Sequence, residues 1–589
     1  MRKLLFPSLC VLALCSAGSE LRQLHAADNA SVNTNADIIP EAASGLGTIK
    51  QAASTTHMAV TANPHATEAA HKILSSGGTA ADAAIAAQLV LGLVEPQSSG
   101  IGGGAFVLHW QNENKNLTSW DGRETAPAAV DVRHFMQGEK PMPFFDAVIG
   151  GHAVGTPGVV ALLEALHAHH GSLPWISLFQ PAINLARNGF EISPRLHALL
   201  LKIPKVAVNP QITHYFFEAD GTTPKAVGTL LKNPAYADTL GEIAKKGAKE
   251  FYDGHIAKDI VEAVANDPNR PGKLSRSDLR NYAAKQRVPV CGEFRQYQIC
   301  GMGPPSSGGT TVAALLGTLQ HVASAKTEPG NQAHFFAEAS RLAFADRSRY
   351  LADPDFESVP TTGLISADYL LKRSALIKPR SSMLSAPAGL PHGSEGLRYR
   401  GSTSPELPST SHFSIVDDHG NIVSMTSSIE TAFGSRIMVG GFLLNNQLTD
   451  FSFTPENETG LIANRIEGGK RPRSSMSPTI VFEGGKPKLV IGSPGGARII
   501  DYVARSIWDV LENGVPLAQA IAGPHIVHMG RQLELEEGRS SPALVQYLEA
   551  LGHKVSLKPQ TSGLHAIWIG DSTLEGGADP RREGTIQGN

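Results

Sequence analysis

The sequence predicts an α+β fold in which helices cover β-sheet, because its character changes near residue 410. Residues 150–350 alternate helical patterns with loops, as when helices pack over a sheet. After Thr410 come short apolar segments typical of strands, followed by an amphipathic helical pattern at 497–514. These expected strands are HFSIVDD (412–418), NIVSMTSS (421–428), GGFLLNN (440–446) and KLVIGS (488–493).

The composition is that of an ordinary globular protein with a small-molecule partner. The chain has 589 residues, 41% of them hydrophobic and 18% charged, and a formal net charge of −3. No basic stripe or acidic tail suggests nucleic acid, so we expect none as a partner. At about 150 residues per domain, the length allows several domains or one large layered domain. No internal repeat is present in the sequence.

The first 27 residues are expected to be a secretory signal peptide. They combine a basic start, an apolar run from Leu4 to Ala17 and small residues at Ala26 and Ala27. That run is too short to span a membrane, and no later stretch reaches the ~20 apolar residues that a spanning helix needs. The sequence therefore predicts an exported protein, either periplasmic or secreted, without a membrane span.

Two cysteines remain after removal of the signal peptide. Cys291 and Cys300 flank GEFRQYQI, where two strands could return on each other. An exported protein can oxidise such a pair. The sequence leaves a disulfide and two buried free thiols equally open, because the pairing depends on geometry.

Two helices are expected near the start of the mature chain. NPHATEAAHKILSSGG (63–78) has helical spacing and a Gly-Gly stop. In the next segment Thr79 can cap a helix, with Asp82 three residues on. That helix is nearly all small or apolar until Pro96, so it must be buried, and AFVLHW (105–110) follows as a strand.

A β-hairpin is expected around residues 410–428. Apolar residues flank Asp417 to Asn421, a cluster of turn formers, which predicts two strands joined by a short loop. If the hairpin is symmetric about His419, Thr410 lies opposite Ser428. Taken alone, the two hydroxyls could simply be a hydrogen-bonded cross-strand pair.

Standard catalytic motifs are absent from the sequence. It contains no GxxxxGK[ST], HExxH or GxSxG, so phosphate-loop, zincin and hydrolase-elbow chemistries lack support. His167, His169 and His170 could bind a metal, but no acidic or cysteine partner stands at ligand spacing. We therefore interpret them as an exposed helix end, and expect neither a metal site nor a cofactor.

The remaining chemistry is a hydroxyl nucleophile that the chain makes by cutting itself. Residues 381–409 are rich in Ser, Pro, Gly and Leu without periodicity, which indicates an exposed segment. Cleavage between Ser409 and Thr410 would give Thr410 a free α-amine, whose pKa of about 7.7–8.0 leaves it partly neutral. Such an amine can act as the base for its own hydroxyl, with Ser428 orienting that hydroxyl.

Acyl transfer also needs an oxyanion hole, and VIGSPGGARII (490–500) offers one. A strand leads into Gly495 and Gly496 at the start of a helix, where backbone N–H groups could meet a developing negative charge. A tight strand-to-helix turn is the alternative interpretation of this glycine pair.

Many long motifs together resemble the γ-glutamyltransferases (γ-glutamyltranspeptidases). They run in order from about Ala53 to Arg581, and include GTPG (155–158), PPSSGG (304–309), LLNNQLTDF (443–451), RPRSSMSPTI (471–480) and GSPGGARI (492–499). The resemblance implies an Ntn-hydrolase fold, a four-layer αββα sandwich. It also implies a precursor cleaved into a large subunit, residues 28–409, and a small subunit, residues 410–589, which remain together as a heterodimer.

The resemblance also implies roles for single residues. It makes Thr410 the nucleophile, with Ser428 beside it and Gly495 and Gly496 as the oxyanion pair. Arg123, Ser474 and Ser475 match groups that hold the substrate's α-carboxylate, and Gln447 and Asp450 match groups that hold its α-ammonium. A cation for a carboxylate and an anion for an ammonium select a free amino acid head, so γ-glutamyl compounds such as glutathione are the expected substrates.

Two departures from the family pattern bear on specificity. Glu430 stands where many members have Asn, although a carboxylate also suits an ammonium. The segment 451–470 lacks the tyrosine of the enteric-type lid, which could leave the pocket less closed.

Two other functions compete with this interpretation. A glutaryl or cephalosporin acylase of the same superfamily would need no ammonium site, and a self-cleaving receptor would bind γ-glutamyl peptides without turnover.

Overall fold

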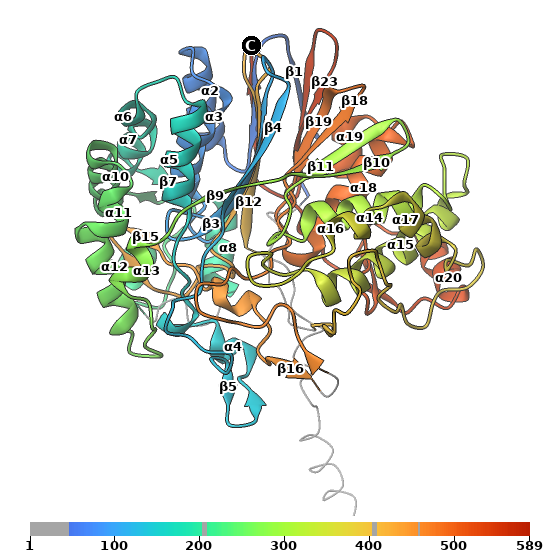
Figure 1. The fold of residues 1–589 in the computed structure, drawn as a ribbon. Helices are drawn as coiled ribbons and strands as arrows, with labels where there is room; N and C mark the ends of the chain where they lie inside the picture. Colours follow the sequence, from blue (N-terminus) through green and yellow to red (C-terminus); the bar gives the residue numbers. More distant parts are fainter. Residues whose placement is uncertain (1–45, 203–208, 403–408, 458–459) are drawn as a thin grey trace, which may run out of the picture. The chain divides into compact units, whose positions relative to one another are not determined.

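Two antiparallel sheets of seven strands each lie face to face at the centre of the fold (Figure 1). The computed structural model describes residues 46–202, 209–402, 409–457 and 460–589. The sheet containing β12 has the order β25 (Thr585–Gly588), β2 (Met58–Thr61), β12 (Thr410–Val416), β13 (Ile422–Ser428), β3 (Gly104–Gln111), β4 (Asn116–Gly122) and β9 (Lys285–Arg287). The sheet containing β19 has the order β1 (Lys50–Ser54), β24 (Leu574–Ala578), β23 (His565–Ile569), β19 (Lys486–Gly492), β18 (Thr479–Glu483), β11 (Tyr297–Gly301) and β10 (Val290–Phe294).

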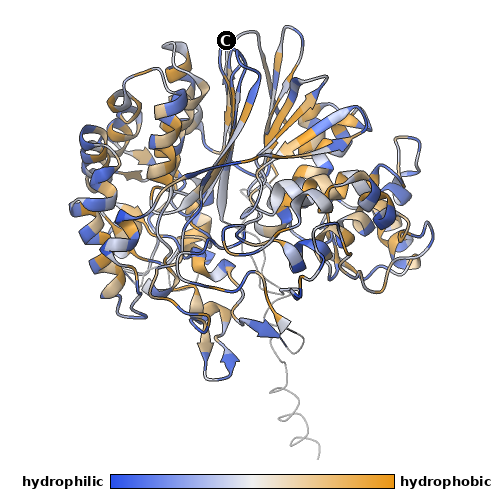
Figure 2. Ribbon diagram, viewed as in Figure 1, coloured by the Kyte–Doolittle hydropathy of each residue, from blue (hydrophilic) through white to orange (hydrophobic). Residues whose placement is uncertain are grey.

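Helices cover the outer face of each sheet, which completes the four layers. Apolar side chains of β3, β12 and β13 form one core with the helices on that side, and those of β11, β18 and β19 form another. The first group includes α2 (Pro64–Ser75), α3 (Ala80–Val94), α5 (Val159–His170), α7 (Gln180–Asn188), α8 (Pro194–Lys202), α9 (Pro210–Phe216), α10 (Pro234–Lys246) and α12 (His255–Ala265). The second includes α14 (Gly308–Leu319), α15 (Pro329–Tyr350), α17 (Ala367–Ser374), α18 (Ile499–Leu511), α19 (Leu517–Ala522) and α20 (Pro542–Ala550). Many of these helices are orange on one side and blue on the other in Figure 2.

The predicted α+β class is confirmed, and most elements lie where the sequence places them. Thr79 accepts a hydrogen bond from the N–H of Asp82, whose carboxylate accepts from the N–H of Thr79, and every residue of α3 is buried. One element differs: GGFLLNN forms a strand only at β15 (Phe442–Leu443), paired with β14 (Met438–Val439). Beyond it, the side chains of Asn445 and Asn446 donate to the carbonyl oxygens of Gly102 and Val148, so they tie this segment to distant parts of the chain.

Residues between the two sheets are apolar at one end and polar at the other. Met58, Trp110, Val416 and Ile480 belong to an apolar cluster that joins the sheets. Nearer the start of β12, His412 contacts Thr426 at 2.8 Å. Hydroxyl and imidazole groups therefore surround the point where the predicted nucleophile lies.

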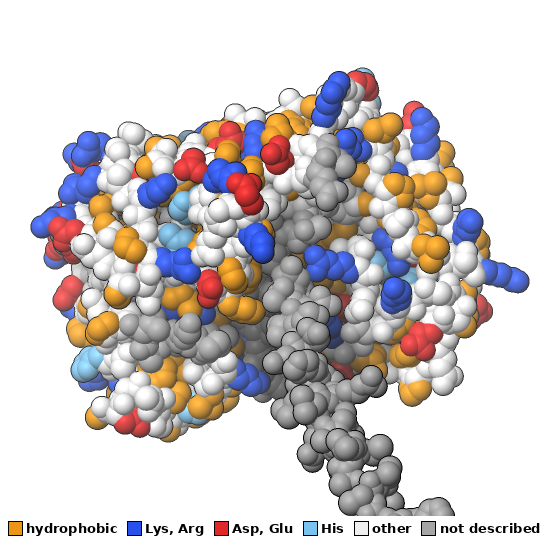
Figure 3. Space-filling model, turned by 90° about the horizontal axis from the view of Figure 1, so that it is seen from below, with side chains coloured by type: hydrophobic (Ala, Val, Ile, Leu, Met, Phe, Trp, Pro, Cys, Tyr) orange, Lys and Arg blue, Asp and Glu red, His pale blue; other side chains and the backbone are white. Residues whose placement is uncertain are grey.

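None of the helices in the described residues combines the length and hydropathy needed to cross a membrane. On the face drawn in Figure 3, acidic and basic side chains are scattered or mixed rather than gathered by sign. The predicted signal peptide, residues 1–27, lies outside the described residues. The described part of the predicted exposed segment, residues 381–402, is mostly exposed or half-buried.

The structure resolves the state of the cysteines, which form a disulfide across β10 and β11. Cys291 and Cys300 lie directly opposite each other, with their Cα atoms 4.1 Å apart. Because the bond joins residues nine apart in sequence, its removal is expected to lower the free energy of unfolding by roughly 2–3 kcal/mol. Denaturant unfolding with and without dithiothreitol measures this effect. Reductant should destabilise the wild type and leave a Cys291→Ala/Cys300→Ala variant unchanged; equal sensitivity of both proteins would contradict the prediction.

Buried histidines are expected to make the protein unstable in acid. Burial lowers the pKa of five of them to about 3, namely His109, His152, His528, His553 and His565. Their unfolded pKa is about 6.5, so below that pH the unfolded state binds more protons. Each should then cost up to about 1.4 kcal/mol of stability per pH unit as the pH falls from about 6.5 toward 3. Thermal unfolding between pH 7.5 and 4.5 measures this loss, and a constant melting temperature would contradict it.

Candidate active site

Thr410 begins β12, and its hydroxyl lies beside the peptide bond that precedes it. The predicted register is confirmed, because Thr410 pairs with Ser428. Thr410 Oγ1 donates to Ser428 Oγ at 3.3 Å, and Ser428 Oγ donates to the carbonyl oxygen of Ser409 at 2.6 Å. The N–H of Glu430 donates to Ser428 Oγ at 2.9 Å, which fixes that hydroxyl. Ser428 thus connects the candidate nucleophile to the carbonyl of the bond expected to break.

The predicted glycine turn follows β19 and lies next to the start of β12. Gly495 has φ +142° and Gly496 has φ +59°, conformations that favour glycine, and a short 3₁₀ turn (Gly496–Arg498) leads into α18. A β-carbon on Gly492, at the end of β19, would lie 2.3 Å from the ring of His412. Thr410 begins the same strand and lies on the same face as His412. The end of β19, from which the glycine turn continues, therefore lies near the start of β12.

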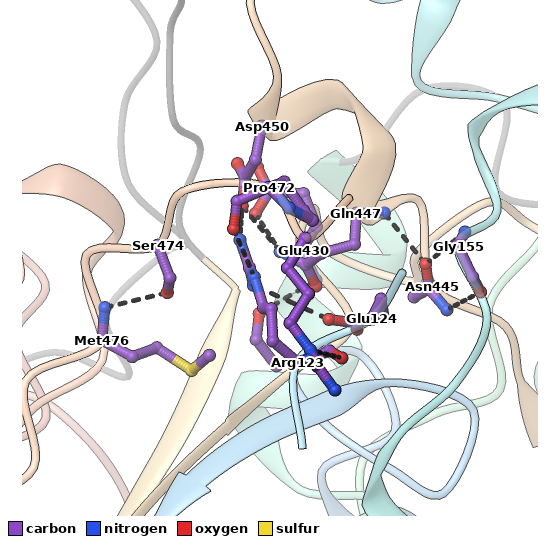
Figure 4. A network of polar contacts seen from close by, with 12 residues as sticks. Arg123, Glu124, Gly155, Glu430, Asn445, Gln447, Asp450, Pro472, Ser474 and Met476 are labelled. Atoms are coloured by element: carbon purple, nitrogen blue, oxygen red, sulfur yellow. Dashed lines mark hydrogen bonds and ion pairs between the residues drawn. The ribbon is translucent and has the colours of Figure 1, made fainter. Parts of the chain in front are cut away.

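A buried cluster of opposite charges forms the candidate head-group site (Figure 4). The Nη2 of Arg123 donates to Asp450 Oδ2 and, at 3.0 Å, to the carbonyl oxygen of Arg473. The amide nitrogen of Gln447 donates to Glu430 at 2.9 Å and to Asp450 at 2.8 Å. The structure brings together four of the six residues expected at this site, namely Arg123, Glu430, Gln447 and Asp450. The Arg123 side chain is 1% exposed, so its charge is paired inside the protein and not at the surface.

The charges of this cluster depend on one another. Burial alone would lower the pKa of Arg123, but the carboxylates of Asp450, Glu124 and Glu430 raise it. Burial raises the pKa of Glu124 to about 8, against the opposing effect of Arg123. Neither carboxylate oxygen of Glu124 has a hydrogen-bond partner among the described residues. Glu124 is therefore expected to be largely protonated near neutral pH, and the close ion-pair contact of Arg123 is with Asp450.

Ser474 and Ser475 lie next to the head-group cluster, but their hydroxyls have other partners. Ser474 Oγ accepts from the N–H of Met476 at 3.1 Å, and Ser475 Oγ accepts from Arg347 at 2.6 Å. The segment that carries the two serines is linked to Arg123 through its backbone, because Arg123 Nε donates to the carbonyl oxygen of Pro472 at 3.1 Å. The serine pair is thus adjacent to the site rather than bonded to its guanidinium.

Several contacts around the nucleophile come from residues that sequence reasoning missed. Arg582 Nη1 donates to the carbonyl oxygen of Thr410 at 3.2 Å. Ser409 Oγ donates to the carbonyl oxygen of Gln97, in the loop after α3. In the sequence, Arg582 appears only as an arginine after ADPR, and Gln97 only as a polar residue after a buried helix. Neither pattern indicates which distant residue the side chain or carbonyl would contact.

The three histidines at the end of α5 have contacts within the protein. His167 and His169 each contact a backbone carbonyl at 2.8 Å, and His170 stacks on His109 with ring centroids 3.8 Å apart. Of the three, His169 is exposed, whereas His167 and His170 are half-buried. Among the described residues, no three His, Cys, Asp or Glu side chains come together as metal ligands.

Comparisons with known proteins agree with the fold and with the resemblance. The cephalosporin acylase of Bacillus halodurans has a crystal structure that matches with a TM-score of 0.80 at 24% identity, over 93% of this chain and 99% of that one, which shows the same fold. The glutathione hydrolase proenzyme of Escherichia coli K12 is 36% identical over 541 residues, 89% of this chain and 90% of that protein. The acylase ACY 1 proenzyme of Pseudomonas sp. SE83 is 32% identical over 549 residues, 91% and 94% of the two chains.

The predicted four-layer Ntn-hydrolase sandwich is thereby confirmed, with two helical layers enclosing two sheets. The gamma-glutamyltranspeptidase family model matches residues 66–588, which is nearly all of the described chain. The chain therefore belongs to the gamma-glutamyltranspeptidase family.

Proposed function

We propose that the protein is a γ-glutamyltransferase and glutathione hydrolase whose precursor cuts itself between Ser409 and Thr410. The observation that carries the proposal is the position of Thr410, at the start of a central strand with its hydroxyl bonded to Ser428. The products would be a large subunit ending at Ser409 and a small subunit, residues 410–589. The relatives named as proenzymes support such a precursor.

Cleavage of the Ser409–Thr410 peptide bond needs the groups that surround this bond and one water molecule. Thr410 Oγ1 attacks the carbonyl carbon of Ser409, and the C–N bond breaks as the α-nitrogen of Thr410 takes up the hydroxyl proton. Water then hydrolyses the resulting ester. The products are the carboxylate of Ser409 and the free α-amine of Thr410. Ser428 Oγ already donates to the Ser409 oxygen at 2.6 Å, where negative charge develops during the attack.

Removal of this donor is expected to slow maturation. A Ser428→Ala variant should cleave about 10²–10³ times more slowly, the usual cost of losing one donor to an oxyanion. Appearance of the small subunit, followed by denaturing electrophoresis and mass spectrometry, measures the rate. A Ser428→Thr variant keeps a hydroxyl and should mature. Unchanged cleavage of the alanine variant would show that Ser428 does not act on this carbonyl.

Turnover of a γ-glutamyl compound would use the new α-amine as base. Thr410 Oγ1 attacks the γ-carbonyl, the departing amine takes a proton, and water or an acceptor amine resolves the γ-glutamyl ester. Backbone N–H groups of the turn at Gly495 and Gly496 are suited to hold the oxyanion. An α-amino acid head carries both a carboxylate and an ammonium, so it can replace the Arg123–Asp450 contact and leave neither charge unpaired.

The same proposal includes export of the protein. The predicted signal peptide at residues 1–27 supports it, and the disulfide between Cys291 and Cys300 fits an oxidising compartment.

Two measurements on the expressed protein test the proposed function. Mass spectrometry and N-terminal sequencing should find a chain that begins at Thr410, and the protein should release p-nitroaniline from γ-glutamyl-p-nitroanilide. An active protein with its chain intact at residue 410 would overturn the mechanism. A cleaved protein that binds γ-glutamyl compounds without turnover would favour the receptor function.

A further inference from the structure

Arg582 is a buried cation bonded directly to the proposed nucleophile. Its side chain lies in the segment between β24 and β25 and is 3% exposed. Nη1 donates to the carbonyl oxygen of Thr410 at 3.2 Å, and Nη2 donates to the carbonyl oxygen of Thr561 at 3.1 Å. The guanidinium fork therefore ties Thr410 to the segment before β23.

The surrounding residues hold Arg582 in this position. Lys50 Nζ donates to the carbonyl oxygens of Arg582, at 3.2 Å, and Gly584, at 2.7 Å, which fixes the backbone on both sides of Glu583. A β-carbon on Gly563 would lie 2.6 Å from Arg582 Cδ and 2.7 Å from Pro494 Cγ. The stem of Arg582 thus passes Gly563 next to the proline that precedes the glycine turn.

Cleavage would place a second positive group close to this guanidinium. The amine nitrogen and the carbonyl oxygen of Thr410 belong to one residue, so a cation bonded to the oxygen lies within a few ångströms of the nitrogen. A nearby like charge in a buried site disfavours the protonated amine. An ordinary α-amine has a pKa of about 7.7–8.0 and is mostly protonated at pH 7, when it cannot act as a base.

We infer that Arg582 is a positioning residue that keeps the α-amine of Thr410 uncharged at neutral pH and orients it through the carbonyl group. This inference rests on the proposed function, because it requires cleavage before Thr410. It adds to that function a reason why a terminal amine could accept a proton from its own hydroxyl at neutral pH.

Other titratable groups near the start of β12 have partners of their own. Glu95 contacts Arg195 at 3.4 Å, and Glu430 accepts from Gln447 at 2.9 Å. Asp579 contacts Arg581 at 3.1 Å, and Glu583 accepts from the N–H of Arg195 at 3.0 Å. Burial lowers the pKa of His412 well below its usual range and that of His565 to about 3, so both are neutral. Lys50 lies on the Arg582 side together with the carboxylates of Glu583 and Asp579, and burial lowers the pKa of Lys50.

A pair of variants separates the charge of Arg582 from its packing. Arg582→Lys keeps a positive charge without the fork, whereas Arg582→Gln keeps a donor without the charge. The readout is the pH dependence of kcat/KM for γ-glutamyl-p-nitroanilide, measured on the matured fraction of each protein. We expect the acidic limb of the glutamine variant to move up by about one pH unit, with activity recovering above pH 8.5. The lysine variant should keep the wild-type limb.

A structural role alone gives a different result. Activity of the glutamine variant would then fall by a similar factor at every pH with the acidic limb unmoved, and this outcome overturns the inference. A wild-type protein that neither cleaves nor releases p-nitroaniline would instead overturn the proposed function.

A direct titration keeps the inference testable if neither variant matures. The matured wild type is labelled with acetic anhydride across a pH series, and acetylation of Thr410 is quantified by mass spectrometry. A midpoint below the range of about 7.7–8.0 for ordinary α-amines supports the inference. A midpoint within or above that range overturns it.

Discussion

A Thr410→Ala variant is expected to remain a single uncleaved chain without measurable turnover. The substitution removes the oxygen that attacks the Ser409 carbonyl and, after cleavage, the γ-glutamyl carbonyl. The rate with γ-glutamyl-p-nitroanilide should fall by at least about 10⁴-fold, the usual scale for loss of a nucleophile. Electrophoresis should show one band near the 62.3 kDa of the full chain, less any signal peptide removed.

A neighbouring hydroxyl provides a matched control for this experiment. Ser411 is also buried on β12, and its Oγ has no hydrogen-bond partner among the described residues. A Ser411→Ala variant should therefore fold, cleave and turn over substrate nearly as the wild type does. Maturation of the Thr410→Ala protein, or equal failure of both variants, would contradict the assignment of Thr410.

Loss of the Asp450 carboxylate is expected to abolish the preference for substrates with an α-ammonium group. γ-Glutamyl and glutaryl anilides differ only in this group, so comparing them isolates the ammonium contact. In an Asp450→Asn variant, kcat/KM for the γ-glutamyl anilide should fall by about 10²–10³, equivalent to roughly 3–4 kcal/mol from a broken buried ion pair. Turnover of the glutaryl anilide should change much less.

The same comparison separates the transferase from the acylase. An acylase needs no ammonium site, so its rate with the γ-glutamyl anilide would survive the Asp450→Asn change. Circular dichroism should confirm that the variant folds, because Arg123 loses a buried partner. An unchanged ratio of the two rates would favour the acylase, consistent with similarity to an acylase proenzyme.

Local features of the fold were predictable because local physical chemistry specifies them. Turn formers between two apolar runs fixed the hairpin and its register, so Thr410 faces Ser428 as expected. A capping pair at Thr79 and Asp82 fixed the start of α3. Glycines after an apolar strand fixed the turn at Gly495, where φ is positive.

Long-range features could not be obtained from the same patterns. Arg582 donates to the carbonyl oxygen of Thr410, although the two residues are 172 positions apart in sequence. No local pattern around either residue predicts this contact. The head-group residues were assigned only through the family resemblance, and the structure adds that Gln447 bridges Glu430 and Asp450. The state of Cys291 and Cys300 was not predictable for another reason. The two residues are close in sequence, but a disulfide requires them to lie directly opposite each other on β10 and β11, and the sequence pattern does not specify this register.

The order of strands in the two sheets determines what the expected cut can do to the assembly. β2 lies between β25 and β12, β13 pairs with β3, and β11 pairs with β18, so each sheet combines strands from both sides of residue 410. Pulling the two fragments apart would break main-chain ladders in both sheets and open the interior. Diluting the cleaved protein should therefore release neither fragment under native conditions. The pair should melt in one concerted transition whose midpoint rises with protein concentration, because unfolding separates two chains.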